Sequence, residues 1–84
     1  MTDIPHLQAV NITPGRLARW RDQAHALGDA GGALARELQA VELDSTRHRL
    51  SRAAKAARHV EMATTGEAQM IARAVATEIE DAIE

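Results

Sequence analysis

The sequence contains no cysteine, and this absence excludes both a disulfide framework and a zinc site built from thiolates. Phenylalanine and tyrosine are missing as well, which leaves Trp20 as the sole aromatic side chain in 84 residues. Small domains use large apolar side chains, disulfides, metals or partners to offset a conformational entropy cost of roughly 1–2 kcal/mol per residue. Because this chain has no disulfide and few large apolar side chains, we expect a partner to complete its core.

No apolar stretch approaches the ~20 residues that a membrane-spanning helix needs. The first residues also lack a basic segment followed by an apolar one, the pattern of a secretion signal. We therefore expect a cytoplasmic protein that has no membrane partner. Arginine supplies nearly all of the cations and alanine is abundant, a composition typical of GC-rich bacterial or phage genomes.

Apolar residues recur every three or four positions from residue 17 to residue 41, the spacing of helices that pack lengthwise in bundles and coiled coils. Thr13 followed by Pro14 favours a helix start, because threonine caps a helix and proline suits its first position. Thr64 and Glu67 form the pattern of a capping box and predict another helix start. The sequence predicts helices at about 14–27, 33–62 and 65–83, in a single helical domain over residues 14–84. The capping-type residues at 44–46 could form a bend or turn within the second helix, but the absence of glycine and proline there favours a long helix.

Residues 1–13 have no helical period, and we expect them to form an extended N-terminal arm. Val10 and Ile12 would then cover the helices, and a partly disordered terminus is the alternative. The predicted fold class is all-α: a small antiparallel helical bundle of two to three helices, completed by oligomerisation. A dimer is the simplest closed form.

Gly28, Gly31 and Gly32 lie in the middle of the first apolar stretch. A helix–helix turn would use the conformational freedom of glycine, whereas a continuous helix would cost about 1 kcal/mol for each glycine relative to alanine. The apolar spacing keeps its phase across the glycines, and both interpretations are compatible with it.

Patterns that carry chemistry are weak. His48 and His59 share a helix face but lie roughly 16 Å apart along the axis, too far to hold one metal ion. The glycine-rich segment at residues 28–32 lacks the Lys-Ser/Thr pair of a phosphate-binding P-loop. We therefore predict no catalytic residues, no metal site, no cofactor and no enzymatic activity.

A helix-turn-helix motif requires a small residue, then a glycine four positions later, then an apolar residue six positions after that. This spacing occurs at Ala24, Gly28 and Leu34. Asp29 and Glu37, however, fall where that motif is normally apolar. The second helix would also begin with small residues that cannot reach base edges. DNA recognition by this element is therefore not favoured.

A basic segment follows between residues 47 and 59. Its cations could bind nucleic acid through phosphate groups, or they could form a solvated face neutralised by the acidic residues of 65–83. The net charge of only −2 favours the second interpretation. The possible surface for an anionic partner consists of Arg47, Arg49, Arg52, Lys55 and Arg58.

These patterns predict a protein–protein interaction module, a regulatory or assembly factor, with nucleic-acid binding as the alternative. We expect a homo-oligomer, a protein partner or both. Trp20 would be the main contact if it is exposed in the monomer. Packing and self-association are assigned to the apolar seams: Leu17, Trp20, Leu27, Leu34, Leu38, Ile71, Val75, Ile79 and Ile83.

Overall fold

A computed structural model describes residues 10–83 of the chain. The all-helical fold class is confirmed, but the prediction of two to three helices is wrong, because this part of the chain contains four α-helices and one short 3₁₀ helix. The elements are α1 (Pro14–Ala26), the short 3₁₀ helix η2 (Gly28–Gly31), α2 (Gly32–Leu43), α3 (Arg47–Ala63) and α4 (Gly66–Ile83).

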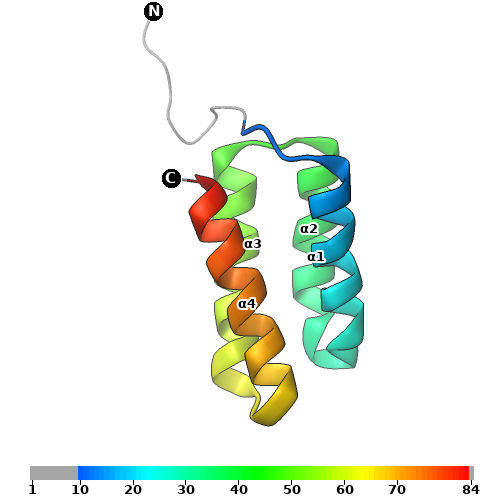
Figure 1. The fold of residues 1–84 in the computed structure, drawn as a ribbon, viewed down its shortest axis with the longest axis vertical. Coiled ribbons are helices and arrows are strands. Elements are labelled where there is room, and N and C mark those ends of the chain that lie inside the picture. Colours follow the sequence, from blue (N-terminus) through cyan, green and yellow to red (C-terminus); the bar gives the residue numbers. More distant parts are fainter. Residues whose placement is uncertain (1–9, 84) are drawn as a thin grey trace, which may run out of the picture.

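Neighbouring helices run in opposite directions (Figure 1): α1 and α2 form one hairpin, and α3 and α4 form a second. The hairpins lie side by side, with α2 packed against α3 and α1 against α4. The most extensive helix contact is between α3 and α4. The connection between the hairpins lies at the same end of the molecule as the start of α1 and the end of α4.

The start of α1 agrees with the sequence prediction. The Thr13 side chain accepts a hydrogen bond from the backbone N–H of Arg16 at 3.3 Å, and Pro14 is the first helical residue. At the other predicted helix start, the hydroxyl of Thr64 donates to the carbonyl oxygen of Val60 at 2.6 Å and so serves the end of α3. The start of α4 falls on Gly66, whose φ is +67°.

The helix predicted over residues 33–62 is two helices in the structure, α2 and α3. Asp44 is extended, with φ −155° and ψ 92°, and ends α2. Ser45 donates its hydroxyl to the carbonyl oxygen of Val41 at 3.1 Å, and the Thr46 side chain accepts from the backbone N–H three residues later at 3.3 Å. These side chains satisfy backbone groups at both helix ends, and the chain can therefore turn without glycine or proline.

The glycines form a turn between α1 and α2, in agreement with the first of the two interpretations left open by the sequence. Gly28 adopts φ +65°, a conformation that favours glycine. Gly31 has φ −89° and ψ 3°, values open to any residue, but it is buried against the end of α1. A Cβ atom at Gly31 would lie 2.2 Å from the carbonyl oxygen of Ala24 and 2.8 Å from the Cβ of Leu27. Close packing, rather than a left-handed backbone, requires glycine at this position.

Apolar side chains from all four helices form one core cluster, in which Trp20, Leu34, Leu50 and Ile79 are fully buried. More than half of the buried residues of α3 and α4 are alanines, whose small side chains let two helix backbones approach closely. This packing explains how a chain with few large apolar residues forms a core. The buried alanines of the two helices are Ala53, Ala54, Ala57, Ala72 and Ala76.

The described end of the predicted N-terminal arm lies against the helices. Val10 and Ile12 are partly buried and pack on the core cluster. The backbone N–H of Val10 donates to the carbonyl oxygen of Ser45 at 2.7 Å, which ties the arm to the connection between the hairpins. The remainder of the predicted arm, residues 1–9, lies outside the described residues.

Replacing Gly31 with alanine tests the close packing of the turn. We expect Gly31→Ala to lower the free energy of unfolding by about 1–3 kcal/mol, because the added methyl group overlaps backbone atoms of α1. Gly32→Ala is the matched control: its Cβ would meet no atom within 4 Å, and we expect about 0.5–1 kcal/mol of added stability. Urea unfolding followed by circular dichroism measures both. Equal stability of Gly31→Ala and the parent chain would contradict this packing.

Candidate functional site

Three large apolar side chains remain exposed in residues 10–83. Leu43 and Met62 each expose 86% of their surface, and Met70 exposes 71%. An exposed methionine is well suited to a contact surface, because its flexible thioether adapts to different partners. Of the three, Met62 lies beside a hollow in the surface, which makes its surroundings the candidate site.

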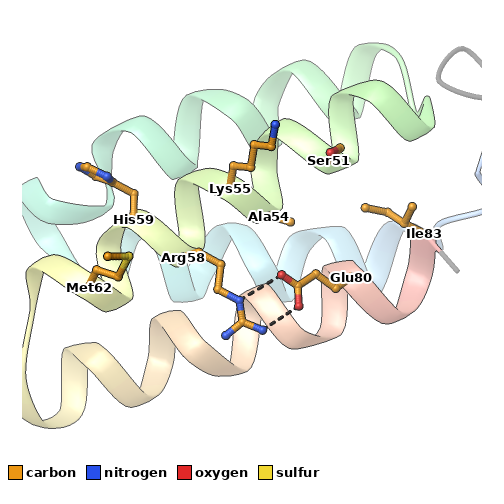
Figure 2. Close-up of a pocket in the computed structure, with 8 residues that line it drawn as sticks. All are labelled: Ser51, Ala54, Lys55, Arg58, His59, Met62, Glu80 and Ile83. Atoms are coloured by element: carbon orange, nitrogen blue, oxygen red, sulfur yellow. Dashed lines mark hydrogen bonds and ion pairs between the residues drawn. The ribbon is translucent and has the colours of Figure 1, made fainter.

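The hollow has a volume of about 390 Å³ and lies between α3 and α4 (Figure 2). Its apolar part is formed by Ala54 and Met62 of α3 together with Ile83 near the end of α4. Lys55, Arg58 and His59 supply cationic or titratable groups along one side. The lining residues are Ser51, Ala54, Lys55, Arg58, His59, Met62, Glu80 and Ile83.

Arg58 connects the two helices that form the hollow. Its guanidinium donates to both carboxylate oxygens of Glu80 on α4, with distances of 2.6 Å from Nη2 and 3.0 Å from Nε (Figure 2). Nη1 donates to Glu61 Oε1 at 2.8 Å, and the second oxygen of Glu61 accepts from Arg73 Nε at 2.7 Å. Four charged groups thus form a network across α3 and α4, and its interhelical pairs show which residues of the two helices lie near the same height.

The network changes the acidity of its carboxylates. Hydrogen bonds from Arg73 and then from Arg58 lower the pKa of Glu61 below its ordinary value. The hydrogen bond from Arg58 likewise lowers the pKa of Glu80. Both carboxylates are therefore ionised at neutral pH, and the positive charge of Arg58 is directed toward α4 instead of the solvent.

Lys55 and His59 differ from Arg58, because they are exposed and project from α3 away from α4 (Figure 2). Lys55 makes no ion pair with any residue in the range 10–83. Its ammonium group is thus available to an anionic group approaching α3 from outside.

The five predicted cations do not share one uninterrupted surface. Arg52 faces α2, where its guanidinium lies 3.4 Å from Glu37, and Arg58 faces α4. Neutralisation by the acidic residues of 65–83, the interpretation favoured by the sequence, therefore applies to Arg58, whereas Arg52 pairs with an acid of α2 instead. Of the five predicted cations, the other three make no ion pair within residues 10–83: Arg47, Arg49 and Lys55.

The residues predicted for packing and self-association lie mostly inside the fold. Ile71 and Ile83 are partly buried against the core cluster. Trp20 has no exposed surface, and the condition under which it would be the main contact is therefore not met. The other apolar residues of that set pack against one another within a single chain: Leu17, Leu27, Leu34, Leu38, Val75 and Ile79 are all buried.

Sequence reasoning missed Met62 and Glu80 as members of the candidate site. The signal for Met62 was present, because it lies seven residues after Lys55 and three after His59 and therefore on the polar side of α3. An apolar residue on a polar helix face indicates a contact with something outside the helix pair. Glu80 could not be paired with Arg58 until the packing of α4 on α3 was known.

Residues 10–83 contain neither a metal-binding cluster nor a membrane-spanning helix. Within residues 10–83, no three histidine or acidic side chains lie close enough together to hold a metal ion. None of the helices in this part of the chain is both long and apolar enough to span a bilayer. No family model matches the chain, and no match was found among curated proteins or solved structures. The function is therefore argued from the surface of α3 and α4.

The ion-pair network predicts a specific dependence of stability on pH. Because the pKa values of Glu61 and Glu80 are lower in the folded chain than in the unfolded chain, their contribution is present above the ordinary glutamate pKa. It is lost as the pH falls through the lowered values. Arg58→Met should therefore reduce the melting temperature at pH 7, and this difference should shrink toward acidic pH.

Thermal unfolding of the parent chain and of Arg58→Met between pH 7 and pH 2 measures this effect. Lys55→Met is the matched control, because it removes an exposed cation that has no ion pair in residues 10–83. The control should give a nearly constant difference across the range. A difference for Arg58→Met that does not depend on pH would show that the network does not form.

Proposed function

We propose that the protein is a small, non-enzymatic protein-interaction module, a regulatory or assembly factor, that binds an acidic amphipathic helix on α3 and α4. The observation that carries this proposal is the position of Met62, 86% exposed, at a hollow that also contains cationic side chains. Covering one such side chain contributes about 1.5–3 kcal/mol to binding. Helix-in-groove recognition uses this combination of apolar anchors and complementary charges.

The charges at the hollow determine the type of partner. Lys55 and His59 project outward, whereas the acidic Glu80 is held by Arg58. A partner that carries carboxylates beside its apolar residues would meet Lys55 without displacing an existing ion pair. A basic partner would meet like charges at the same place, and like-charge contacts oppose binding.

Nucleic-acid binding is the second candidate. It is supported by three cations that make no ion pair with the described residues 10–83, Arg47, Arg49 and Lys55. Phosphate binding requires a surface that is positive over several nucleotides. Here the carboxylates of Glu37 and Glu80 lie among the cations and engage two of them. This interruption makes the protein-interaction proposal the better supported of the two.

Titration with fluorescently labelled peptides tests the proposal. Two 18-residue helical peptides share the same apolar positions and carry either glutamates or lysines elsewhere. We expect the acidic peptide to bind at least tenfold more tightly, a difference of about 1.4 kcal/mol. Met62→Glu should weaken that binding about tenfold. Leu43→Glu is the matched control on α2, since Leu43 is equally exposed, and should leave it unchanged.

Equal affinity for the two peptides, or no binding of either, would contradict the proposal. A labelled DNA duplex in the same titration tests the second candidate function, nucleic-acid binding. Duplex binding that exceeds peptide binding at low salt and collapses as salt is added would replace the protein-interaction proposal with nucleic-acid binding.

A further inference from the structure

The outward side of α3 carries a continuous ridge of exposed residues. They follow one another at spacings of four, three, four and three, which keeps them on one helix face. The ridge contains basic or titratable groups and ends in an apolar side chain, and it contains no acid. We call this set the α3 ridge, in which Arg52 also pairs with Glu37 of α2: His48, Arg52, Lys55, His59 and Met62.

The outward side of α4 carries a matching ridge with the opposite charge. Its exposed residues follow at spacings of three, four, three and four, and they contain acids, small residues and one methionine, but no base. We call this set the α4 ridge: Glu67, Met70, Ala74, Thr77 and Asp81. The chain therefore carries both a cationic docking surface and an acidic helix face with one exposed methionine, while the main apolar face of α4 is buried in the core.

The interhelical ion pairs give the approximate relative heights of the two ridges. The pair Glu61–Arg73 gives one estimate of the α4 residue at the height of Lys55. Lys55 lies six residues before Glu61, and because α4 is antiparallel to α3, the level residue lies six positions after Arg73, at residue 79. From the pair Arg58–Glu80, the same count of three residues gives residue 83. Asp81 lies midway, at the height of Lys55.

The same counting applies to the apolar end of the α3 ridge. Met62 is one residue beyond Glu61, which corresponds to residue 72, and four residues beyond Arg58, which corresponds to residue 76. Ala74 lies midway, at the height of Met62. A large apolar side chain on α3 is thus level with a small one on α4, and a charged side chain is level with one of opposite sign.

We propose that the partner of this face is a second copy of the chain, related by a two-fold axis parallel to the helices. Such an axis preserves height and places α3 of one copy antiparallel over α4 of the other. Lys55 then faces the Asp81 of the other copy, and Met62 packs on the other copy's Ala74. Because the contact is reciprocal, each pairing occurs twice and the assembly closes as a dimer.

The size of the face indicates how stable this dimer is. Helices of 17 and 18 residues are about 26 Å long, and two packed helices at the usual spacing are about 20 Å wide. Each copy would bury about 500 Å², or about 1,000 Å² in total, which is at the low end for specific interfaces. We therefore expect a reversible dimer with a dissociation constant in the micromolar range.

This inference rests on the proposed function, because it assigns a partner to the same face. Most of the apolar residues that the sequence analysis assigned to self-association are buried inside each copy. The proposed dimer is formed by exposed residues of α3 and α4 instead. The face meets both requirements for a reciprocal contact: opposite charges level with each other, and an exposed apolar side chain level with a small one.

Sedimentation equilibrium of the full chain between about 1 and 500 µM tests the inference. The parent chain should pass from monomer to dimer in this range. Lys55→Glu and Asp81→Lys should each raise the dissociation constant at least tenfold, because each creates two like-charge contacts. The double variant, with both substitutions, again places opposite charges against each other with the signs exchanged. Its dissociation constant should therefore lie within about threefold of that of the parent chain.

Arg36→Glu and Asp22→Lys are the matched controls, since both residues are exposed and lie on α2 and α1, outside the proposed interface. Both should dimerise like the parent chain, and circular dichroism confirms that every variant is folded. A monomeric parent chain at 500 µM, or a dimer insensitive to both Lys55→Glu and Asp81→Lys, overturns the inference. A monomer that still prefers the acidic peptide overturns only self-association, whereas a monomer that binds neither peptide overturns the proposed function as well.

Discussion

The reversal of the chain at Asp44, Ser45 and Thr46 is the constraint on which the rest of the structure depends. Because α2 ends there and α3 begins, the second hairpin folds back along the first. The apolar face of α1 and α2 then meets the apolar face of α3 and α4 within the same chain. Trp20 is fully buried by this closure, and its indole N–H donates to Glu78 of α4 at 3.5 Å.

Closure of the core within one chain determines what the surface presents. Charged side chains remain outside, and those of α3 and α4 connect across the helix pair through Arg58, Glu61, Glu80 and Arg73. Exposed ion pairs contribute little to stability, and this network mainly shows which residues of α3 and α4 lie at the same height. Hydrophobic burial and the close approach of alanine-lined helices stabilise the fold itself.

The sequence predicted the fold class and the start of α1, because threonine and proline at a helix start have a local physical cause. It did not predict the break after Leu43, since serine and threonine can satisfy helix ends without the glycine or proline that usually marks a turn. Periodicity also identified Trp20 as facing other helices, but it carries no information on whether those helices belong to the same chain. Pairings such as Arg58 with Glu80 depend on helix packing and are therefore invisible in the sequence.

The central claim, that one chain closes its own core, is tested most directly by the fluorescence of Trp20, the sole tryptophan. At concentrations well below 1 µM, where dimers dissociate, the emission should remain blue-shifted and resist quenching by iodide, as it does at high concentration. Emission that is red-shifted and readily quenched in the dilute chain, and that becomes protected only as the concentration rises, would contradict the claim. It would show that a second chain is required to bury Trp20.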